Sequence, residues 1–190
     1  GETLYAFIPR SLAGQAAEAW RFEASRLRRA GARAFGLKNR VVAYALAEAA
    51  LALGLAVWSP RAVLFLLADA AIAATLLEGF NYVAHYGLER RLGPDGRPEP
   101  LQPRHSWTTG RRANNAALYN MGRHADHHRF AARAYETLEA APGAAELPCG
   151  YACALLMALV PPLWRRVMDP LAERAMARGG PAPERQKATA

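Results

Sequence analysis

Cysteine is almost absent from this sequence, because only Cys149 and Cys153 occur in 190 residues. Two cysteines four positions apart supply neither the disulfide framework of a small secreted domain nor the spacing of a zinc ribbon. Acidic residues are also in the minority, with 16 Asp and Glu against 24 Lys and Arg and a net charge of +8. Aromatic residues are not interleaved with these cations, so we do not expect a nucleic-acid surface. An anionic membrane surface or an acidic protein partner remains open.

Charge is nearly missing from two long stretches of the chain. Residues 41–58 contain only Glu48, and residues 62–77 contain only Asp69. As helices these stretches span roughly 24–27 Å, and a few further apolar residues at their outer ends extend them to the ~30 Å core of a bilayer. We therefore predict a transmembrane helical hairpin over residues 39–80. A buried Ala/Leu-rich hairpin in a soluble helical bundle is the alternative.

Positive charge lies at both outer ends of this hairpin. Eight Lys and Arg precede Val41, six Arg lie between positions 90 and 112, and the connecting turn contains only Arg61. This distribution predicts insertion from the cytoplasmic side of the membrane. Residues 1–38 are basic and contain Trp20 and Phe22, which favours an amphipathic helix at the membrane interface or a solvated helix packed on its own domain.

Three of the five histidines occur in the run His124-Ala125-Asp126-His127-His128. On a helix the positions i, i+3 and i+4 lie on one face, so His124, His127 and His128 would project side by side. Neutral imidazole is a common ligand of zinc, iron, copper and nickel. The run therefore predicts a metal-binding face, with a merely polar, pH-titrating cluster as the alternative.

His85 lies at the end of the second apolar run, on the expected cytoplasmic side. Glu78, Asn81 and His85 share one stripe of a helix, and ionisable groups at such a depth usually face a cavity or a site. We predict that His85 is a metal ligand, although a structural helix-end histidine is the simpler interpretation of this residue alone. Asn81 is placed to orient the His85 ring or to hold a water, and Glu78 is a further candidate neighbour of the site.

His105 lies in a predicted loop, in the triplet His105-Ser106-Trp107. It is a candidate ligand, proton carrier or hydrogen-bond partner of a ligand, and equally a plain loop residue. Asp126 points away from the three-histidine face, where it forms a cap or an ion pair or reaches a ligand on another element. The two cysteines are expected to pack in an apolar helix rather than to bind metal.

The four candidate ligands are all histidines and lie next to membrane helices, which favours iron used with dioxygen over structural zinc. Imidazole alone does not select among these metals. We expect an all-α membrane helical bundle, with a transmembrane hairpin and a cytoplasmic helical metal-binding region.

The rest of the chain divides by composition. A continuous helix is expected from about residue 109 to 135, and the third uncharged run, residues 147–164, reads as a short span, a re-entrant piece or a core helix. The predicted segments are an interfacial segment 1–38, the hairpin 39–80, a histidine-bearing metal-binding region 81–146, an apolar C-terminal helix 147–175 and a disordered tail 176–190.

Several motifs together resemble the integral-membrane alkane monooxygenase family, part of the membrane fatty-acid desaturase/hydroxylase superfamily. They are NYVAHYGLERR at residues 81–91, HSW at residues 105–107 and YNMGRHADHHRFAARAYETLE at residues 119–139. Residues 1–27 and 147–170 are also similar to the C-terminal half of that family. The likeness covers about residues 1–175, with the motifs in the same order.

This resemblance implies a fragment of a six-helix protein of the bacterial inner membrane, with a histidine-ligated di-iron centre on the cytoplasmic side. Members hydroxylate the terminal carbon of an alkane with O₂, and they take electrons from rubredoxin, which a rubredoxin reductase reduces. By motif, His85 corresponds to the third histidine box, and His124, His127 and His128 to the last. His105 lies in a family motif and is carried over only as a neighbour of the site.

The sequence also departs from the family pattern. The two earlier histidine boxes, which supply about half of the ligands, have no counterpart here, so we expect the chain to be part of a longer protein and inactive alone. Ala84 stands where the family usually has Glu, which removes a carboxylate beside the metal. Thr108, Gly122 and Ala125 stand where Asn, Gln and Ser are usual.

Three other functions fit the same residues. One is desaturation or hydroxylation of a fatty acyl chain or an aromatic methyl group within the same superfamily. Another is a non-catalytic membrane protein that binds one metal ion through the three-histidine face. The last is a truncated paralogue that binds no metal.

Overall fold

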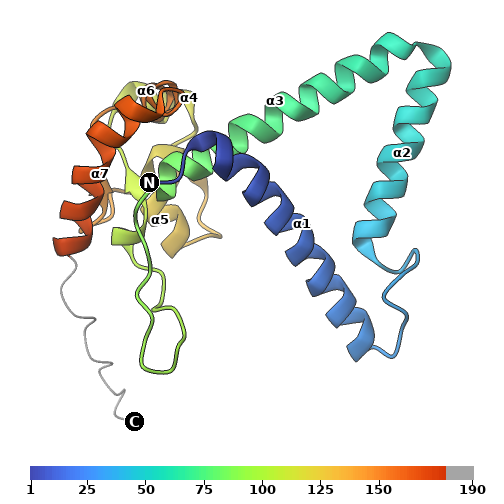
Figure 1. Ribbon diagram of the computed structural model, residues 1–190, viewed down its shortest axis with the longest axis horizontal. Coiled ribbons are helices and arrows are strands. Elements are labelled where there is room, and N and C mark those ends of the chain that lie inside the picture. Colours follow the sequence, from blue (N-terminus) through green and yellow to red (C-terminus); the bar gives the residue numbers. More distant parts are fainter. Residues whose placement is uncertain (179–190) are drawn as a thin grey trace. The chain divides into compact units, whose positions relative to one another are not determined.

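The computed structural model describes residues 1–178, and these are mostly helical, which confirms the all-α class (Figure 1). The helices are α1 Leu4–Arg29, α2 Arg40–Trp58, α3 Pro60–His85, α4 Arg112–Ala117, α5 His124–Arg129, α6 Tyr151–Ala158 and α7 Pro161–Arg178. Three short 3₁₀ turns are η1 Pro103–His105, η2 Met121–Arg123 and η3 Tyr135–Thr137. The strands β1 Trp107–Thr108 and β2 Ala145–Glu146 pair in parallel.

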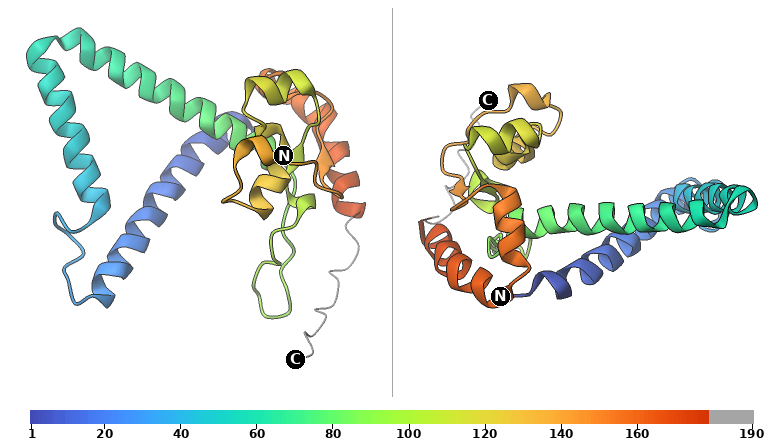
Figure 2. Two further views of the ribbon diagram at one scale, coloured as in Figure 1. Left: turned by 180° about the vertical axis from the view of Figure 1, so that it is seen from behind. Right: turned by 90° about the horizontal axis from the view of Figure 1, so that it is seen from above.

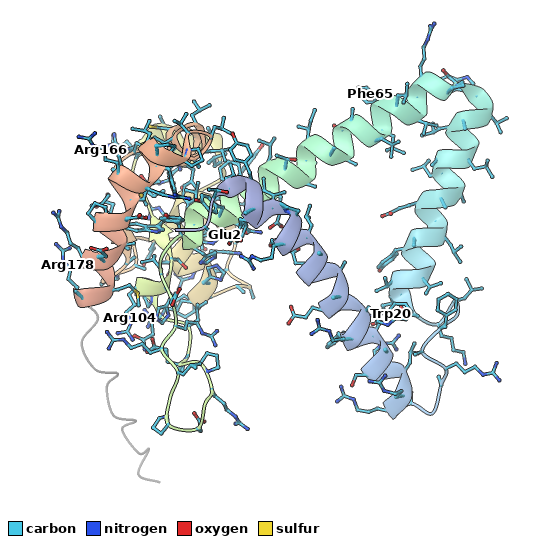
Figure 3. All side chains as sticks on the ribbon, in the orientation of Figure 1. Glu2, Trp20, Phe65, Arg104, Arg166 and Arg178 are labelled. Carbon is cyan, nitrogen blue, oxygen red and sulfur yellow. The ribbon has the colours of Figure 1, made fainter. Side chains whose placement is uncertain are left out.

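Residues Tyr5–Glu78 form one compact unit, made of α1, α2 and most of α3. Both α2 and α3 are long and apolar enough to cross a membrane, with a mean hydropathy of 1.9 in their most apolar windows. None of that window is buried in α2 and 11% of it is buried in α3. Their large side chains project outward, as Phe65 does in Figure 3. Within the described residues the hairpin is therefore exposed, and its apolar surface suits a lipid environment.

The start of α2 is fixed by polar contacts to the chain before it. Asn39 is fully buried and caps the helix, because its side chain accepts the Val41 N–H and donates to the Ala34 carbonyl. The Arg40 N–H donates to the Glu23 carboxylate of α1. These bonds satisfy backbone donors that the first turn of a helix leaves without partners.

The remaining described residues, Gly1–Leu4 and those from Gly79 onward, form the second compact unit. Here α3 continues five residues past the expected end of the hairpin, to His85, and is followed by Gly87 at φ +69°. Tyr86 and Trp164 of α7 pack edge to face at 5.2 Å, and the Tyr86 hydroxyl donates to Asp169 at 2.6 Å. Tyr82, in the last turn of α3, also packs against Trp164 at 5.6 Å, so the end of α3 lies in a core with α7.

The helix expected over residues 109–135 is broken into short pieces. After α4 the backbone turns through Tyr119 and Asn120, both in the left-handed region at φ 49° and 58°, and α5 ends at Arg129. Gly122 explains part of this path, because a Cβ there would approach the Asn115 Oδ1 atom to 2.1 Å. The chain can pass this close to α4 only with glycine at that position.

The apolar run after residue 147 also differs from the expected single helix. It forms α6, which has eight residues, and α7, which begins at Pro161. Tyr151, Ala154 and Ala158 of α6 are buried, so this helix packs in the core and is too short to cross a bilayer. Helix α7 continues to Arg178, and the rest of the predicted tail lies outside the described residues.

Candidate metal site

The rings of His85, His124 and His128 converge, the first from the end of α3 and the other two from α5. Figure 2 shows the backbone of these elements, with α3 in green. The Nε2 atoms of His128 and His124 are 2.9 Å apart, and those of His128 and His85 are 3.2 Å apart. The Nε2 atoms of His124 and His85 are separated by 3.3 Å. Within residues 1–178, this is the group of histidine, cysteine or acidic side chains whose ligand atoms lie close enough together to hold one ion.

These distances fit a shared metal ion. Three nitrogen ligands at about 2.0–2.1 Å from one ion lie about 3.0 Å apart when the bonds are perpendicular, and about 3.4 Å apart when they are tetrahedral. The observed separations of 2.9, 3.2 and 3.3 Å fall in the same range. All three donors are imidazole nitrogens, a set that accepts iron, zinc, copper or nickel.

The tautomer of His85 suits this role. Its Nδ1 atom lies 3.2 Å from the carbonyl oxygen of His105, a group that can only accept a hydrogen bond. Nδ1 therefore carries the proton, and Nε2 keeps a free lone pair directed at the other two rings. A backbone carbonyl that orients a ligand histidine in this way is a common feature of metal sites.

Burial keeps two of the rings neutral. Desolvation lowers the pKa of His124 to about 3 and that of His128 to about 4, and the neighbouring histidines lower both pKa values further. At neutral pH both rings are therefore uncharged, which is the form that binds metal.

His105 is buried and acts on the site through its backbone carbonyl, while its ring faces another network. Its Nδ1 accepts the Gln102 N–H at 3.0 Å, so Nε2 carries the proton and donates to Glu99 Oε1 at 3.0 Å. Arg104 pairs with the other oxygen of the same carboxylate. These bonds hold η1, and with it the carbonyl that orients His85.

Asp126 forms an ion pair, one of the alternatives that helix geometry predicts. Its Oδ2 atom accepts bonds from Arg133 at 2.8 Å and from the Glu139 N–H at 3.0 Å, and its side chain is buried. The carboxylate thereby ties the segment after α5 back onto that helix. This fixes the position of α5 and of its histidines.

The other predicted site residues lie outside the group of three. The His127 ring is 6.0 Å from that of His124 and 5.9 Å from that of His128, on the same helix, and its nitrogens do not join the cluster. Glu78 is fully buried and accepts a hydrogen bond from Gln15 of α1 at 2.8 Å. Asn81 is half-buried, one helical turn before His85.

Hydrogen bonds that link α6, β1 and α4 hold the elements around α5 together, and the sequence did not indicate them. The Tyr151 hydroxyl donates to the Trp107 carbonyl at 2.7 Å, and the ring lies 6.5 Å from that of His124. Asn114 accepts the Tyr151 N–H at 2.7 Å, and Trp107 donates to the Tyr86 carbonyl. Of these residues, Trp107 lies in the HSW triplet and Tyr86 in the motif at residues 81–91, but neither was identified as a site residue.

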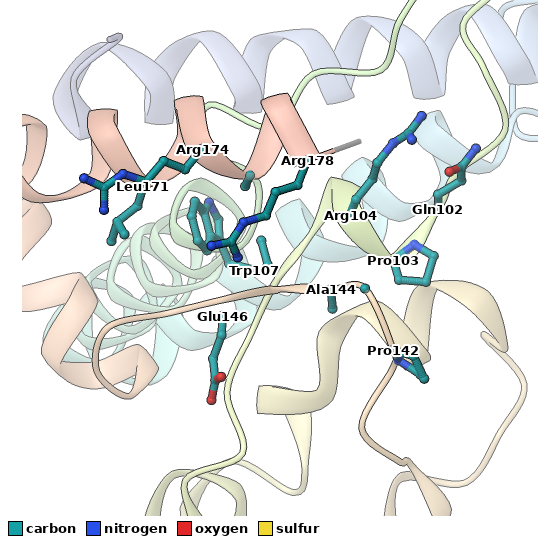
Figure 4. A pocket seen from close by; sticks show the side chains of 13 residues that line it. Gln102, Pro103, Arg104, Trp107, Pro142, Ala144, Glu146, Leu171, Arg174 and Arg178 are labelled. Carbon is teal, nitrogen blue, oxygen red and sulfur yellow. The ribbon is translucent and has the colours of Figure 1, made fainter. Parts of the chain in front are cut away.

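A cavity of about 640 Å³ lies apart from the histidines, between η1, the two strands and α7. Figure 4 shows Arg174 and Arg178 on the α7 side and Glu146 on β2. None of the three clustered histidines lines it. This cavity is therefore distinct from the candidate metal site.

Comparison with known proteins agrees with these features. The sequence profile of the fatty acid desaturase family matches residues 1–148. Alkane 1-monooxygenase 1 of Pseudomonas aeruginosa is 42% identical over 171 residues, which cover 90% of this chain and 45% of that protein. Alkane 1-monooxygenase 2 of Alcanivorax borkumensis is 38% identical, with 90% and 45% covered.

A more distant relative is the xylene/toluene monooxygenase hydroxylase component XylM of Pseudomonas putida. It is 32% identical over 165 residues, which cover 86% of this chain and 43% of that protein. The chain thus spans about half the length of the curated relatives it matches.

Proposed function

Since the chain belongs to the fatty acid desaturase family, we propose that it contributes part of the metal centre of a membrane alkane monooxygenase. The observation that carries this proposal is the convergence of three Nε2 atoms at 2.9–3.3 Å, at the end of an apolar helix long enough to cross a bilayer. Named relatives with 35–42% identity are alkane 1-monooxygenases.

The proposed cofactor is iron, as a di-iron centre. His85, His124 and His128 hold one ion, and His127, beside them on α5, is proposed as a ligand of the centre from its motif. When bound, the iron supplies the activation of O₂ needed to oxidise an unactivated C–H bond. The chain's own part is to keep the rings neutral, to orient His85 through the His105 carbonyl and to exclude water by its apolar helices.

The proposed substrate is an alkane, hydroxylated at its terminal carbon. A hydrocarbon partitions into the lipid interior, the apolar phase that also suits the exposed leucines of α2 and α3. The substrate can therefore reach the end of α3 through the membrane. Electrons come from rubredoxin, itself reduced by rubredoxin reductase. The protein is proposed to be a multi-pass protein of the bacterial inner membrane with the metal on the cytoplasmic side, in accord with the arginines outside the hairpin.

A second candidate is oxidation of an aromatic methyl group. It is favoured by the 32% identity to the hydroxylase component of a xylene/toluene monooxygenase. Both reactions use the same ligands and differ only in the apolar substrate. Analysis of products from an n-alkane and from toluene, given in parallel, separates the two.

The test of the metal centre is the iron content of the full-length gene product, purified in detergent. We expect about two irons per polypeptide, and a loss of at least half of the iron together with O₂-dependent alkane hydroxylation in His124→Ala. His127→Ala is expected to lose iron as well. Arg129→Ala, an exposed substitution one residue after His128, is the matched control and should keep both.

A second measurement uses the 190-residue chain produced alone and determines its metal content and hydroxylation activity. Residues 1–178 contain one group of three converging ligands, so we expect at most about one metal ion and no hydroxylation. Iron content that is unchanged by His124→Ala in the full-length protein would overturn the proposed centre.

A further inference from the structure

A second cavity, of about 490 Å³, lies on the side of α5 where the chain enters it from α4. We call it the Tyr–Arg pocket, after its principal lining residues Arg112, Asn115, Tyr119, Asn120, Arg123 and Tyr135. These residues come from α4, the turn that follows it, η2 and η3, which all belong to the same compact unit. Arg123 directly precedes His124 in the chain.

The positive charge of this pocket is not neutralised by any acidic side chain that lines it. Arg112 and Arg123 line it together with no carboxylate, and neither makes an ion pair in the part of the chain that the structure describes. Arg104 and Arg133, by contrast, pair with buried acids. The Nε atom of Arg123 is buried without a hydrogen-bond partner, although the side chain as a whole is partly exposed. A guanidinium nitrogen that is shielded from water and lacks an acceptor is stabilised most when an anion from another molecule binds it.

The walls of the pocket are held in an unusual conformation. Tyr119 and Asn120 have φ values of 49° and 58°, which are uncommon for residues other than glycine. The Asn120 side chain donates to the Tyr135 carbonyl at 3.1 Å, and the Tyr119 and Tyr135 rings meet edge to face at 5.4 Å. Both rings remain exposed, at 68% and 53%. The turn and η3 therefore each present an exposed tyrosine ring beside the two arginines.

We propose that the Tyr–Arg pocket is a docking site for a carboxylate side chain of an acidic protein, the electron donor of the proposed function. This inference rests on that function. Tyrosine and arginine are the residues enriched where protein interfaces gain most of their binding energy. Guanidinium groups bind carboxylates with two parallel hydrogen bonds. A partner held at Arg123 lies next to the residue that begins the histidine cluster, which is where electrons are needed.

An anionic lipid headgroup carries a similar charge but fits this pocket less well. Among the lining residues only Ala116 offers an aliphatic side chain, so an acyl chain finds little apolar surface there. The exposed tyrosine pair provides amphipathic surface that suits a protein partner.

The test measures the affinity of rubredoxin for the full-length gene product in detergent, with and without added salt. Arg112→Glu should raise the Kd at least about tenfold and reduce its salt dependence, because a repelling charge replaces an attracting one. Arg174→Glu makes the same change of net charge in the larger cavity beside α7, and should leave the Kd within about twofold. With rubredoxin as donor, the effect of Arg112→Glu should appear in its KM more than in kcat.

A second variant, Tyr119→Gly, distinguishes a loss of contacts with rubredoxin from a loss of folding. Glycine suits the φ of 49°, so this variant should raise the melting temperature while it weakens rubredoxin binding several-fold. A merely structural turn would gain stability without losing affinity. Equal rubredoxin affinity in the wild type, Arg112→Glu and Tyr119→Gly would overturn the docking site but leave the proposed function standing.

Three other results would also overturn the inference. A larger loss in Arg174→Glu would place the partner at the other cavity. Weakened binding to anionic vesicles in Arg112→Glu, with rubredoxin affinity unchanged, would assign the pocket to lipid. A wild-type protein that hydroxylates alkanes but has no affinity for rubredoxin would remove the partner, and this docking site with it.

Discussion

The two compact units differ in how far their apolar side chains are buried. In Tyr5–Glu78, α2 has no buried residue although its most apolar window has a mean hydropathy of 1.9. In the histidine-bearing unit, the buried residues include many polar ones: Glu99, His105, Ser106, Thr109, Asn115, His124 and Asp126. One unit thus leaves apolar surface exposed, which suits a nonpolar phase. The other buries large apolar side chains such as Val83 and Trp164 together with these polar groups, most of which are hydrogen-bonded.

Both units nevertheless contain a buried glutamate whose carboxylate binds both an arginine side chain and a backbone N–H. Glu23 pairs with Arg26 and accepts the Arg40 N–H, and these hydrogen bonds lower the pKa of Glu23 to about 2. Glu99 pairs with Arg104 and accepts the Arg91 N–H, which lowers its pKa as well. One carboxylate fixes the start of the apolar hairpin, and the other fixes the turn that orients His85.

The largest expected effect would come from a charge placed on the hairpin. Ile72 is 60% exposed on α3, so in water Ile72→Arg would cost almost nothing. In a bilayer, arginine near the centre of a helix costs about 2.5–3.5 kcal/mol of insertion free energy. We expect the membrane-inserted fraction of the protein to fall accordingly, as measured by protease protection in vesicles.

Leu92→Arg is the control for this substitution, because Leu92 is 70% exposed but lies outside the hairpin. It should insert like the wild type. Equal insertion of both variants would show that α3 does not lie in lipid, and the contrast between the two units would lose its basis.

A pair of glycine substitutions compares the packing of the two units. Gly122→Ala would force a Cβ against Asn115, which is itself buried and bonded to the Thr109 carbonyl, so we expect a loss of about 1–3 kcal/mol. Gly54 in α2 has nothing within 4 Å of its Cβ position, and Gly54→Ala should stabilise by about 0.5–1 kcal/mol. The melting temperatures of the two variants should therefore move in opposite directions, and a fall in both would show that α2 is packed.

An effect similar in size to that of Gly122→Ala, but dependent on pH, is expected at Glu99. Glu99→Gln removes the charge that pairs with Arg104 and should destabilise the fold by about 1–3 kcal/mol at neutral pH. The folded-state pKa of Glu99 is lowered, so its contribution is full above the ordinary carboxyl pKa and is lost as the pH falls through the folded value. The difference between Glu99→Gln and the wild type should thus shrink on acidification in denaturant titrations. Glu89→Gln, the same change of charge at an exposed position, is the control for the loss of stability at neutral pH.

Much of the architecture was predictable from the sequence because charge and hydropathy decide it locally. The two apolar runs became α2 and α3, and the turn at Pro60 follows from a proline at the first helical position. The extra length of α3 was not predictable in the same way. Residues 81–85 are helical because Tyr82, Val83 and Ala84 pack in the core of the second unit, which is tertiary information.

For the site, the i, i+4 spacing of His124 and His128 placed both rings on one face, as periodicity predicts. That His85 completes the group, and that His127 stands outside it, depends on how α3 and α5 cross. The division of residues 109–135 into short helices depends on Gly122 and on the left-handed turn at Asn120. Neither has a periodic signature, and their effect arises from contacts with α4.

Helix α3 has one more consequence, which concerns the thickness of the membrane. Its 26 residues span about 39 Å, compared with about 30 Å of hydrocarbon, so the turns that lead to His85 extend beyond the hydrophobic core. A helix that is too long for its bilayer tilts, and the tilt changes when the thickness changes. Because the last residue of this helix contributes a nitrogen to the histidine cluster, a membrane position for α3 would make the geometry of the candidate metal site depend on lipid chain length.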